Sequence, residues 1–331
     1  MTVSNTTLGA DLRVPIMGFG AMALTPIYGE VDPDDALATL HHAVDRGIGF
    51  LDTANIYGGG ANEELLARLL ATRRREEVVV ATKFGIDADP SSSRRARGDR
   101  EYVRRCVEES LNRLGTDVID LYYLHRVDLD TPIEETVAAM AELVAEGIVG
   151  AIGLSEVTAA ELIRADAVHP IAAVQSEWSL WSRDVEREVV PTAARLGVGF
   201  VPYSPLGRGF LTGTLRFDDL GTNDFRRYLP RFQQTLFTAN IEAVAVVRDI
   251  ARELDATAAQ VALAWLYHQG DQYGLPVVPI PGTRRVGRVE ENLGALTLSL
   301  TEAHLARLDQ VAERTHGARS ADLTWVSAGR E

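Results

Sequence analysis

The sequence alternates short apolar runs with amphipathic stretches, and this alternation continues over most of its 331 residues. The apolar runs predict strands at residues 16–20, 49–53, 77–83, 118–125, 149–154, 172–175, 198–203 and 276–280. Several runs are continuously apolar, which is typical of parallel strands buried on both faces. About eight strands, each followed by a helical pattern, predict an α/β fold in the form of a (β/α)₈ TIM barrel.

Helical spacing of apolar residues fills the intervals between the strands. Asp32 as N-cap and Pro33 in the first turn open the first helix, and Gly47 ends it. Further helices are predicted at residues 63–70, 101–114, 132–147, 159–165, 185–195, 241–254 and 258–267. A doubly wound open sheet is the alternative fold. No G-x-G-x-x-G pattern follows the first strand, and the glycines at 58–60 do not supply one.

Three segments fall outside the repeated pattern. Residues 6–8 and 12–14 flank Gly9 and predict an N-terminal β-hairpin that closes the barrel bottom. Residues 206–239 predict a long loop over the barrel mouth, and loops of this length are usually functional. The arginine-rich segment 94–97 is expected to be a solvated loop. No linker or shift in composition divides the chain, so residues 1–331 are expected to form a single domain.

Composition excludes several classes of protein. With 33 basic and 47 acidic residues, a formal charge of −14 disfavours binding to nucleic acids and to anionic membranes. No apolar run reaches the ~18 to 20 residues of a membrane span, and the N-terminus lacks a signal-peptide pattern. The single cysteine cannot form a disulfide within the chain, so nothing requires an oxidising compartment. No Cys/His spacing indicates a metal site. We therefore expect a cytoplasmic protein without a metal, whose oligomeric state stays open.

The basic residues are unusually uniform, because 32 of the 33 are arginine and the only lysine is Lys83. Lysine can shift its pKa and lose a proton, whereas arginine effectively cannot. In a (β/α)₈ barrel the active site lies at the carboxyl ends of the strands. Asp52, Tyr57, Lys83 and His125 all fall at or just after predicted strand ends. Four titratable side chains are thus expected at one mouth.

These four residue types indicate carbonyl chemistry. A phenol titrates near ~10, and a neighbouring ammonium lowers that pKa. Lys83, compensated by Asp52, would do this for Tyr57. Tyr57 would then deliver a proton to a carbonyl oxygen while the carbonyl carbon accepts a hydride, with His125 orienting the oxygen. Because side chains supply no hydride, a nicotinamide cofactor is required.

The strand-end motifs resemble those of the aldo-keto reductases. The motifs are DTANIY at 52–57, ATK at 81–83, LYYLH at 121–125, GLS at 153–155, VQ at 174–175, YSPLGRG at 203–209 and PIPGT at 279–283. The resemblance extends from about residue 18 to residue 294, and implies a catalytic tetrad of Asp52, Tyr57, Lys83 and His125. The segments GLSEV at 153–157 and AVHPI at 167–171 look like the branch that contains perakine reductase and the plant auxin-induced homologues.

The same resemblance implies an NADPH site. It comprises Ser155, Gln175, Tyr203, Ser204, Leu206, Arg208, Gly282, Thr283, Arg284, Arg288, Glu291 and Asn292. Ser155 and Gln175 would hold the carboxamide, and Tyr203 would stack on the nicotinamide. Independently, the arginines at 284, 285 and 288 favour NADPH over NADH, because arginine suits phosphate. Glu156 departs from the family's common asparagine, and a carboxylate cannot donate to a carboxamide.

The predicted function is NADPH-dependent reduction of an aldehyde or ketone, a small-molecule carbonyl substrate, to an alcohol. Trp178 and Trp181 follow the sixth strand and are expected in the substrate pocket, because such pockets are usually apolar and aromatic. Two alternatives stay open. One is a Schiff-base lyase that uses Lys83. The other is an NADPH-binding sensor with little turnover, because potassium-channel β subunits also resemble this family.

Overall fold

A computed structural model describes residues 3–87, 89, 92 and 95–331. Seven parallel strands lie side by side in chain order. They are β3 (Phe19–Gly20), β4 (Phe50–Asp52), β5 (Val79–Phe84), β6 (Ile119–Leu124), β7 (Val149–Ser155), β8 (Ala173–Glu177) and β9 (Gly199–Tyr203). Each strand pairs only with its neighbours in sequence, and the pairing places Lys83 opposite Tyr123 and Ser155 opposite Gln175. Residues predicted at successive strand ends therefore share one rim.

The eighth predicted strand, residues 276–280, closes this ring without forming a regular strand. The Phe200 amide donates to the Pro276 carbonyl at 2.8 Å, and the Val278 amide donates to Phe200 at 2.9 Å. On the other side, the Gly18 amide donates to the Pro279 carbonyl at 3.0 Å. Prolines at 276 and 279 lack amide protons and interrupt the ladder. The closed ring confirms the barrel and excludes the doubly wound sheet.

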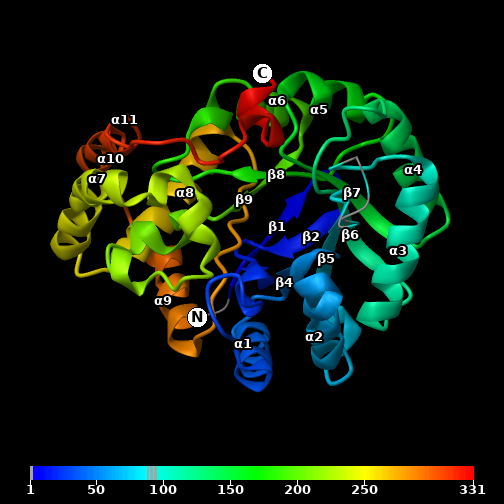
Figure 1. Cartoon of the computed structure of the whole chain (residues 1–331), viewed down its shortest axis with the longest axis horizontal. Coiled ribbons are helices and arrows are strands. Elements are labelled where there is room, and N and C mark those ends of the chain that lie inside the picture. Colours follow the sequence, from blue (N-terminus) through cyan, green and yellow to red (C-terminus); the bar gives the residue numbers. More distant parts are fainter. Residues whose placement is uncertain (1–2, 88, 90–91, 93–94) are drawn as a thin grey trace.

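Helices surround the ring (Figure 1). They are α1 (Pro33–Asp45), α2 (Ala61–Leu70), α3 (Arg100–Leu114), α4 (Ile133–Ala145), α5 (Ala159–Asp166), α6 (Val189–Leu196), α7 (Gln234–Glu253), α8 (Ala258–Tyr273), α9 (Val286–Leu293), α10 (Glu302–Leu308) and α11 (Gln310–Glu313). The Asp32 side chain caps α1 as predicted, accepting from the Asp34 amide at 2.8 Å. Helix α6 begins four residues later than predicted, because a 3-10 turn at Asp184–Glu186 precedes it.

The N-terminal hairpin, β1 (Asn5–Leu8) and β2 (Leu12–Pro15), lies across the ring and appears at its centre in Figure 1. Leu8 is fully buried, and it belongs to an inner cluster with Phe50, Leu121 and Val201 from the strands. A Cβ on Gly199 would lie 2.2 Å from the Leu8 side chain, so glycine permits this close approach. The hairpin therefore plugs one end of the barrel and leaves the strand carboxyl ends open.

The long segment after β9 is not structureless. It contains four 3-10 turns, at Gly207–Thr212, Phe217–Asp219, Phe225–Tyr228 and Pro230–Phe232. Helix α7 then begins at Gln234, seven residues before the predicted start. Buried aromatic contacts such as Phe210–Phe237, 4.9 Å between ring centroids, hold these turns together. The segment is thus a packed cover at the mouth.

Two expectations concern the surface. Arg94 lies outside the described residues, whereas Arg95 pairs with Asp322 and Arg97 with Asp99. Among the described residues, no helix combines the length and apolar character that crossing a membrane requires.

Replacing Leu8 with alanine is expected to lower the free energy of unfolding by about 2–4 kcal/mol, because the hairpin would leave a cavity inside the barrel. Chemical denaturation monitored by tryptophan fluorescence measures this change. Leu12→Ala is the matched control, because Leu12 lies in the same hairpin but is only partly buried. Equal losses in both variants would contradict the role given to Leu8.

Candidate active site

A cavity of about 810 Å³ opens at the carboxyl ends of the strands. Asp52, Tyr57 and His125 line it, as do all the residues that the sequence predicted for the cofactor: Ser155, Gln175, Tyr203, Ser204, Leu206, Arg208, Gly282, Thr283, Arg284, Arg288, Glu291 and Asn292. These residues come from six separate parts of the chain. The fold therefore brings the two predicted groups into one space.

Lys83, on β5, lies behind this cavity and is fully buried. Its ammonium donates to Asp52 Oδ1 at 2.5 Å, to the Thr53 carbonyl at 2.7 Å and to the Tyr57 hydroxyl at 3.4 Å. Burial by itself lowers the pKa of Lys83, but the Asp52 carboxylate, together with the hydrogen bonds to Asp52 and Tyr57, outweighs burial and raises that pKa overall. The lysine is therefore a charged, fully engaged ammonium.

Tyr57 begins a 3-10 turn, Tyr57–Gly60, five residues after the end of β4. Gly58 and Gly59 both have positive φ, at 61° and 64°, and glycine permits this left-handed backbone in the turn that follows Tyr57. Burial raises the pKa of the Tyr57 phenol, and the Lys83 charge reduces this increase without reversing it. The sequence argument expected a lowered pKa; in the structure, Tyr57 is a protonated phenol at neutral pH.

His125 follows β6 directly and is buried. Its ring meets the Tyr57 ring edge-on, with 5.9 Å between centroids. Burial, followed by the charges of Arg126 and Lys83, holds the pKa of His125 well below its ordinary value of 6.5. The imidazole is therefore neutral at physiological pH and is suited to hydrogen bonding rather than to supplying a proton.

One of the two predicted carboxamide ligands contacts the predicted tetrad. Gln175 Nε2 donates to Asp52 Oδ2 at 2.7 Å, so the Asp52 carboxylate fixes the side-chain amide of Gln175. The Ser155 hydroxyl accepts from Arg126 Nη1 at 3.3 Å. Both side chains line the cavity beside Tyr203.

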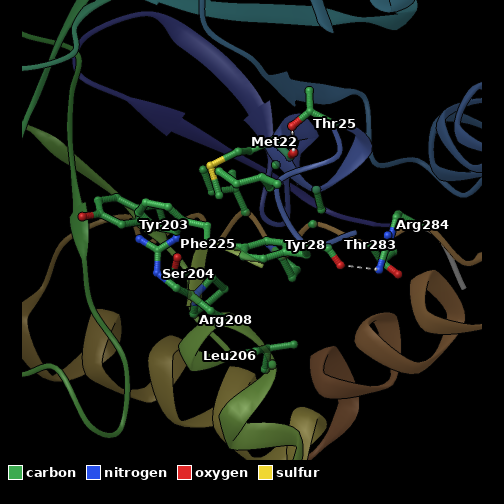
Figure 2. A pocket seen from close by; sticks show the side chains of 18 of the residues that line it. Met22, Thr25, Tyr28, Tyr203, Ser204, Leu206, Arg208, Phe225, Thr283 and Arg284 are labelled. Atoms are coloured by element: carbon green, nitrogen blue, oxygen red, sulfur yellow. Dashed lines mark hydrogen bonds between the residues drawn. The ribbon is translucent and has the colours of Figure 1, made fainter. Parts of the chain in front are cut away.

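The wall of the cavity also carries arginines, two of which, Arg208 and Arg284, are labelled in Figure 2. Arg208 donates to the Tyr28 hydroxyl at 2.9 Å, and Arg284 donates to the Glu30 carbonyl at 2.9 Å. Tyr28 lies between the two arginines in Figure 2. Neither guanidinium forms an ion pair with a carboxylate among the described residues, whereas Arg288 is paired with Glu291. Unneutralised arginines of this kind are suited to bind phosphate.

Glu156 is fully buried and does not point to solvent. Arg319, from the C-terminal segment, donates to both carboxylate oxygens of Glu156 in a bidentate pair, at 2.9 Å each. The Tyr203 hydroxyl donates to Glu156 at 2.7 Å, and the Ser327 amide donates at 3.0 Å. Glu156 therefore links the side chain expected to stack on the nicotinamide with a distant tail.

Neither Trp178 nor Trp181, which the sequence analysis expected in the substrate pocket, lines this cavity. Both are buried. Trp178 packs on Phe200 with 5.0 Å between centroids, and Trp181 packs on Phe210 at 4.8 Å. Reciprocal backbone bonds between Ser179 and Ser182, at 3.1 and 3.2 Å, form a tight turn that keeps this segment beneath the mouth.

The sequence reasoning missed several residues of this site. Arg126 and Tyr28 line the cavity, and Arg319 and Ser327 support Tyr203 through Glu156. Arg126 carried a usable signal, because it directly follows His125 at a strand end. Arg319 carried no such sequence signal, because its partner, Glu156, lies 163 residues earlier in the chain.

Comparisons with known proteins agree with this geometry. The model of the aldo/keto reductase family matches residues 16–313. A protein described as probable aldo-keto reductase 1, from Glycine max, is 45% identical over 297 residues, which cover 89% of this chain and 85% of that protein.

Solved structures are similar as well. The glycerol dehydrogenase AKR11B4 from Gluconobacter oxydans has a TM-score of 0.83 and 27% identity, covering 94% of this chain and 95% of that one. The thermostable aldo-keto reductase Tm1743, in complex with the inhibitor epalrestat, has a TM-score of 0.74 and 29% identity, covering 93% of this chain and 99% of that one.

The fold and these likenesses define an oxidoreductase that acts on carbonyl compounds. The chain belongs to the aldo/keto reductase family. Within the described residues, no group of three or more His, Cys, Asp or Glu side chains could hold a metal ion.

Replacing Glu156 with glutamine is expected to destabilise the protein most strongly near neutral pH. Burial raises the pKa of Glu156, but Arg319 outweighs burial and lowers that pKa from 4.5 to about 2. The stabilisation is fully present above about pH 4.5 and is lost as the pH falls towards 2, and it amounts to roughly 3 kcal/mol. Denaturation curves collected between pH 7 and pH 3 measure this difference.

The gap between Glu156→Gln and the unaltered protein should therefore narrow as the pH falls. Glu134→Gln is the control, because Glu134 pairs with Arg164 at the exposed surface and its loss should matter less. A pH-independent gap would show that the Glu156 charge is not what the network stabilises.

Proposed function

We propose that the chain is an NADPH-dependent carbonyl reductase that converts an aldehyde or ketone to an alcohol, with Tyr57 as the proton donor. The observation that carries the proposal is the Tyr57 hydroxyl at the cavity wall, 3.4 Å from the buried Lys83 ammonium. A protonated phenol beside a fixed positive charge can release its proton when negative charge develops on a neighbouring oxygen.

Each residue of the tetrad has a distinct task in this proposal. Tyr57 donates its proton to the carbonyl oxygen, and Lys83 stabilises the resulting phenolate. Asp52 keeps Lys83 charged, because the two groups are joined at 2.5 Å inside the protein. The neutral His125 donates a hydrogen bond that orients the same oxygen. NADPH, when bound, supplies the hydride.

The cavity residues fit such a cofactor. The cavity has a volume of about 810 Å³, which lies in the range of cofactor sites. We assign Ser155 and Gln175 to the carboxamide, Tyr203 to stacking, and Ser204, Leu206 and Arg208 to the pyrophosphate. Gly282, Thr283, Arg284 and Arg288 would hold the 2′-phosphate, and Glu291 and Asn292 the adenosine. The unneutralised Arg208 and Arg284 are the groups that most favour a phosphate-bearing ligand.

The Schiff-base alternative is disfavoured by the state of Lys83. Imine formation needs a neutral amine with a free lone pair. The Lys83 nitrogen instead makes three hydrogen bonds, and its pKa is raised. The sensor alternative is disfavoured by the tetrad, because Asp52, Tyr57, Lys83 and His125 are arranged for proton transfer rather than for binding alone.

The proposal has four further parts. Residues 1–331 act as one domain, because the N-terminal hairpin and the C-terminal segment both pack onto the barrel. The chain is placed in the branch that contains perakine reductase and the auxin-induced homologues. The reaction takes place in the cytoplasm. The partner is a small carbonyl compound rather than nucleic acid or membrane.

Tyr57→Phe is expected to lower kcat roughly 100- to 10,000-fold, because it removes the proton donor and keeps the ring. Oxidation of NADPH by an aldehyde panel, followed by absorbance, measures turnover. The Kd for NADPH, measured by fluorescence titration, should stay unchanged. Near-normal turnover in this variant would overturn the mechanism.

Arg284→Gln is expected to raise the Kd for NADPH roughly tenfold and to leave the Kd for NADH nearly unchanged, because only NADPH carries the 2′-phosphate. Arg252→Gln removes an exposed arginine on α7 and serves as the charge control. If Arg284→Gln weakened both nucleotides equally, Arg284 would not contact the 2′-phosphate.

A further inference from the structure

The arginines of the cavity differ in how they are neutralised. Six arginines line it, at positions 126, 208, 226, 284, 285 and 288. Arg226 is paired with Asp224 at 2.7 Å, and Arg288 is paired with Glu291. Among the described residues, the other four form no ion pair. A cation in a concave, partly desolvated site without a counter-charge is suited to bind an anion.

Three of these four arginines are explained by the proposed cofactor. Arg208 is assigned to the pyrophosphate, and Arg284 and Arg285 lie in the turn assigned to the 2′-phosphate. Arg126 is not explained in this way, because it follows His125 at the reacting end and the nicotinamide carries no negative charge. The proposed cofactor therefore provides no negative charge for Arg126.

Among the described residues, no carboxylate forms an ion pair with Arg126. Its Nη1 donates to the His125 carbonyl at 2.6 Å and to the Ser155 hydroxyl at 3.3 Å, both of which are neutral. Its Nε is buried and has no hydrogen-bond partner within the part of the chain that the structure describes. The guanidinium carbon of Arg126 also lies 6.0 Å from the ring centroid of Trp325, a residue of the C-terminal segment. The carboxylate of Glu156 is already held by Arg319.

We infer that Arg126 binds a carboxylate on the substrate, so that the preferred substrates are aldehydes or ketones that carry a carboxylate. This inference rests on the proposed reductase function and narrows its substrate class. Arg126 lies beside His125, and an anion bound there leaves the carbonyl free to meet Tyr57 and His125. A carboxylate suits a single guanidinium because charge-assisted hydrogen bonds form at its N–H groups.

Two matched substrate pairs test the inference. One pair is 4-carboxybenzaldehyde and 4-nitrobenzaldehyde, which have nearly the same shape and differ in charge. The other pair is 4-oxobutanoate and butanal, two flexible four-carbon aldehydes of which only the first carries a carboxylate. Steady-state kinetics with NADPH yield kcat and KM for each compound in the unaltered protein, in Arg126→Met and in Arg126→Lys.

Arg126→Met should lower kcat/KM for the carboxylates about 10- to 100-fold, chiefly by raising KM, as expected for loss of a charge-assisted hydrogen bond. The two neutral aldehydes should lose clearly less kcat/KM than the carboxylates, because they make no ionic contact with Arg126. Arg126→Lys should recover part of the loss, because it keeps the charge. Unchanged Kd for NADPH in Arg126→Met would show that the variant is folded and that its cofactor site is intact.

Three outcomes would overturn the inference. Equal losses for charged and neutral substrates would mean that Arg126 acts on the reacting oxygen instead. No loss for any substrate would mean that its charge is unused. Reduction of the neutral aldehydes alone by the unaltered protein would exclude a carboxylate substrate and leave the reductase function standing. If the unaltered protein reduced none of the four, the proposed function itself would fail.

Discussion

The ion pair between Lys83 and Asp52 is the constraint on which the site depends. An ammonium without solvent contact is costly, and a carboxylate at 2.5 Å is what keeps it charged. β4 and β5 are neighbours, and their pairing brings the two residues together. The second oxygen of Asp52 accepts from Gln175 on β8, across the ring. One carboxylate thus contacts both Lys83, which neighbours the proposed proton donor Tyr57, and Gln175, which is assigned to the proposed cofactor.

Much of the barrel and its rim was predictable because parallel strands in chain order place their carboxyl ends together. Asp52, Lys83 and His125 could be grouped from their positions at strand ends alone. The residues predicted for the cofactor could be identified only with the help of the family resemblance, and every one of them lines the cavity. Local patterns decided these features, because each depends on a strand and the few residues that follow it.

Other features could not be read from the sequence, because they depend on balances or on distant contacts. The direction of the Tyr57 pKa shift follows from burial, which outweighs the opposing charge of Lys83, and sequence gives no measure of burial. Trp178 and Trp181 follow a strand, as pocket residues often do, but both are buried in the hydrophobic core. The partner of Glu156 lies in another part of the chain altogether.

The Glu156–Arg319 pair joins two parts of the chain that are synthesised at different times. Glu156 is synthesised 163 residues before the arginine that pairs with it. Every strand of the ring also precedes Arg319 in the sequence. A chain that stops before Arg319 therefore contains every strand but lacks the bidentate partner of the buried Glu156 carboxylate.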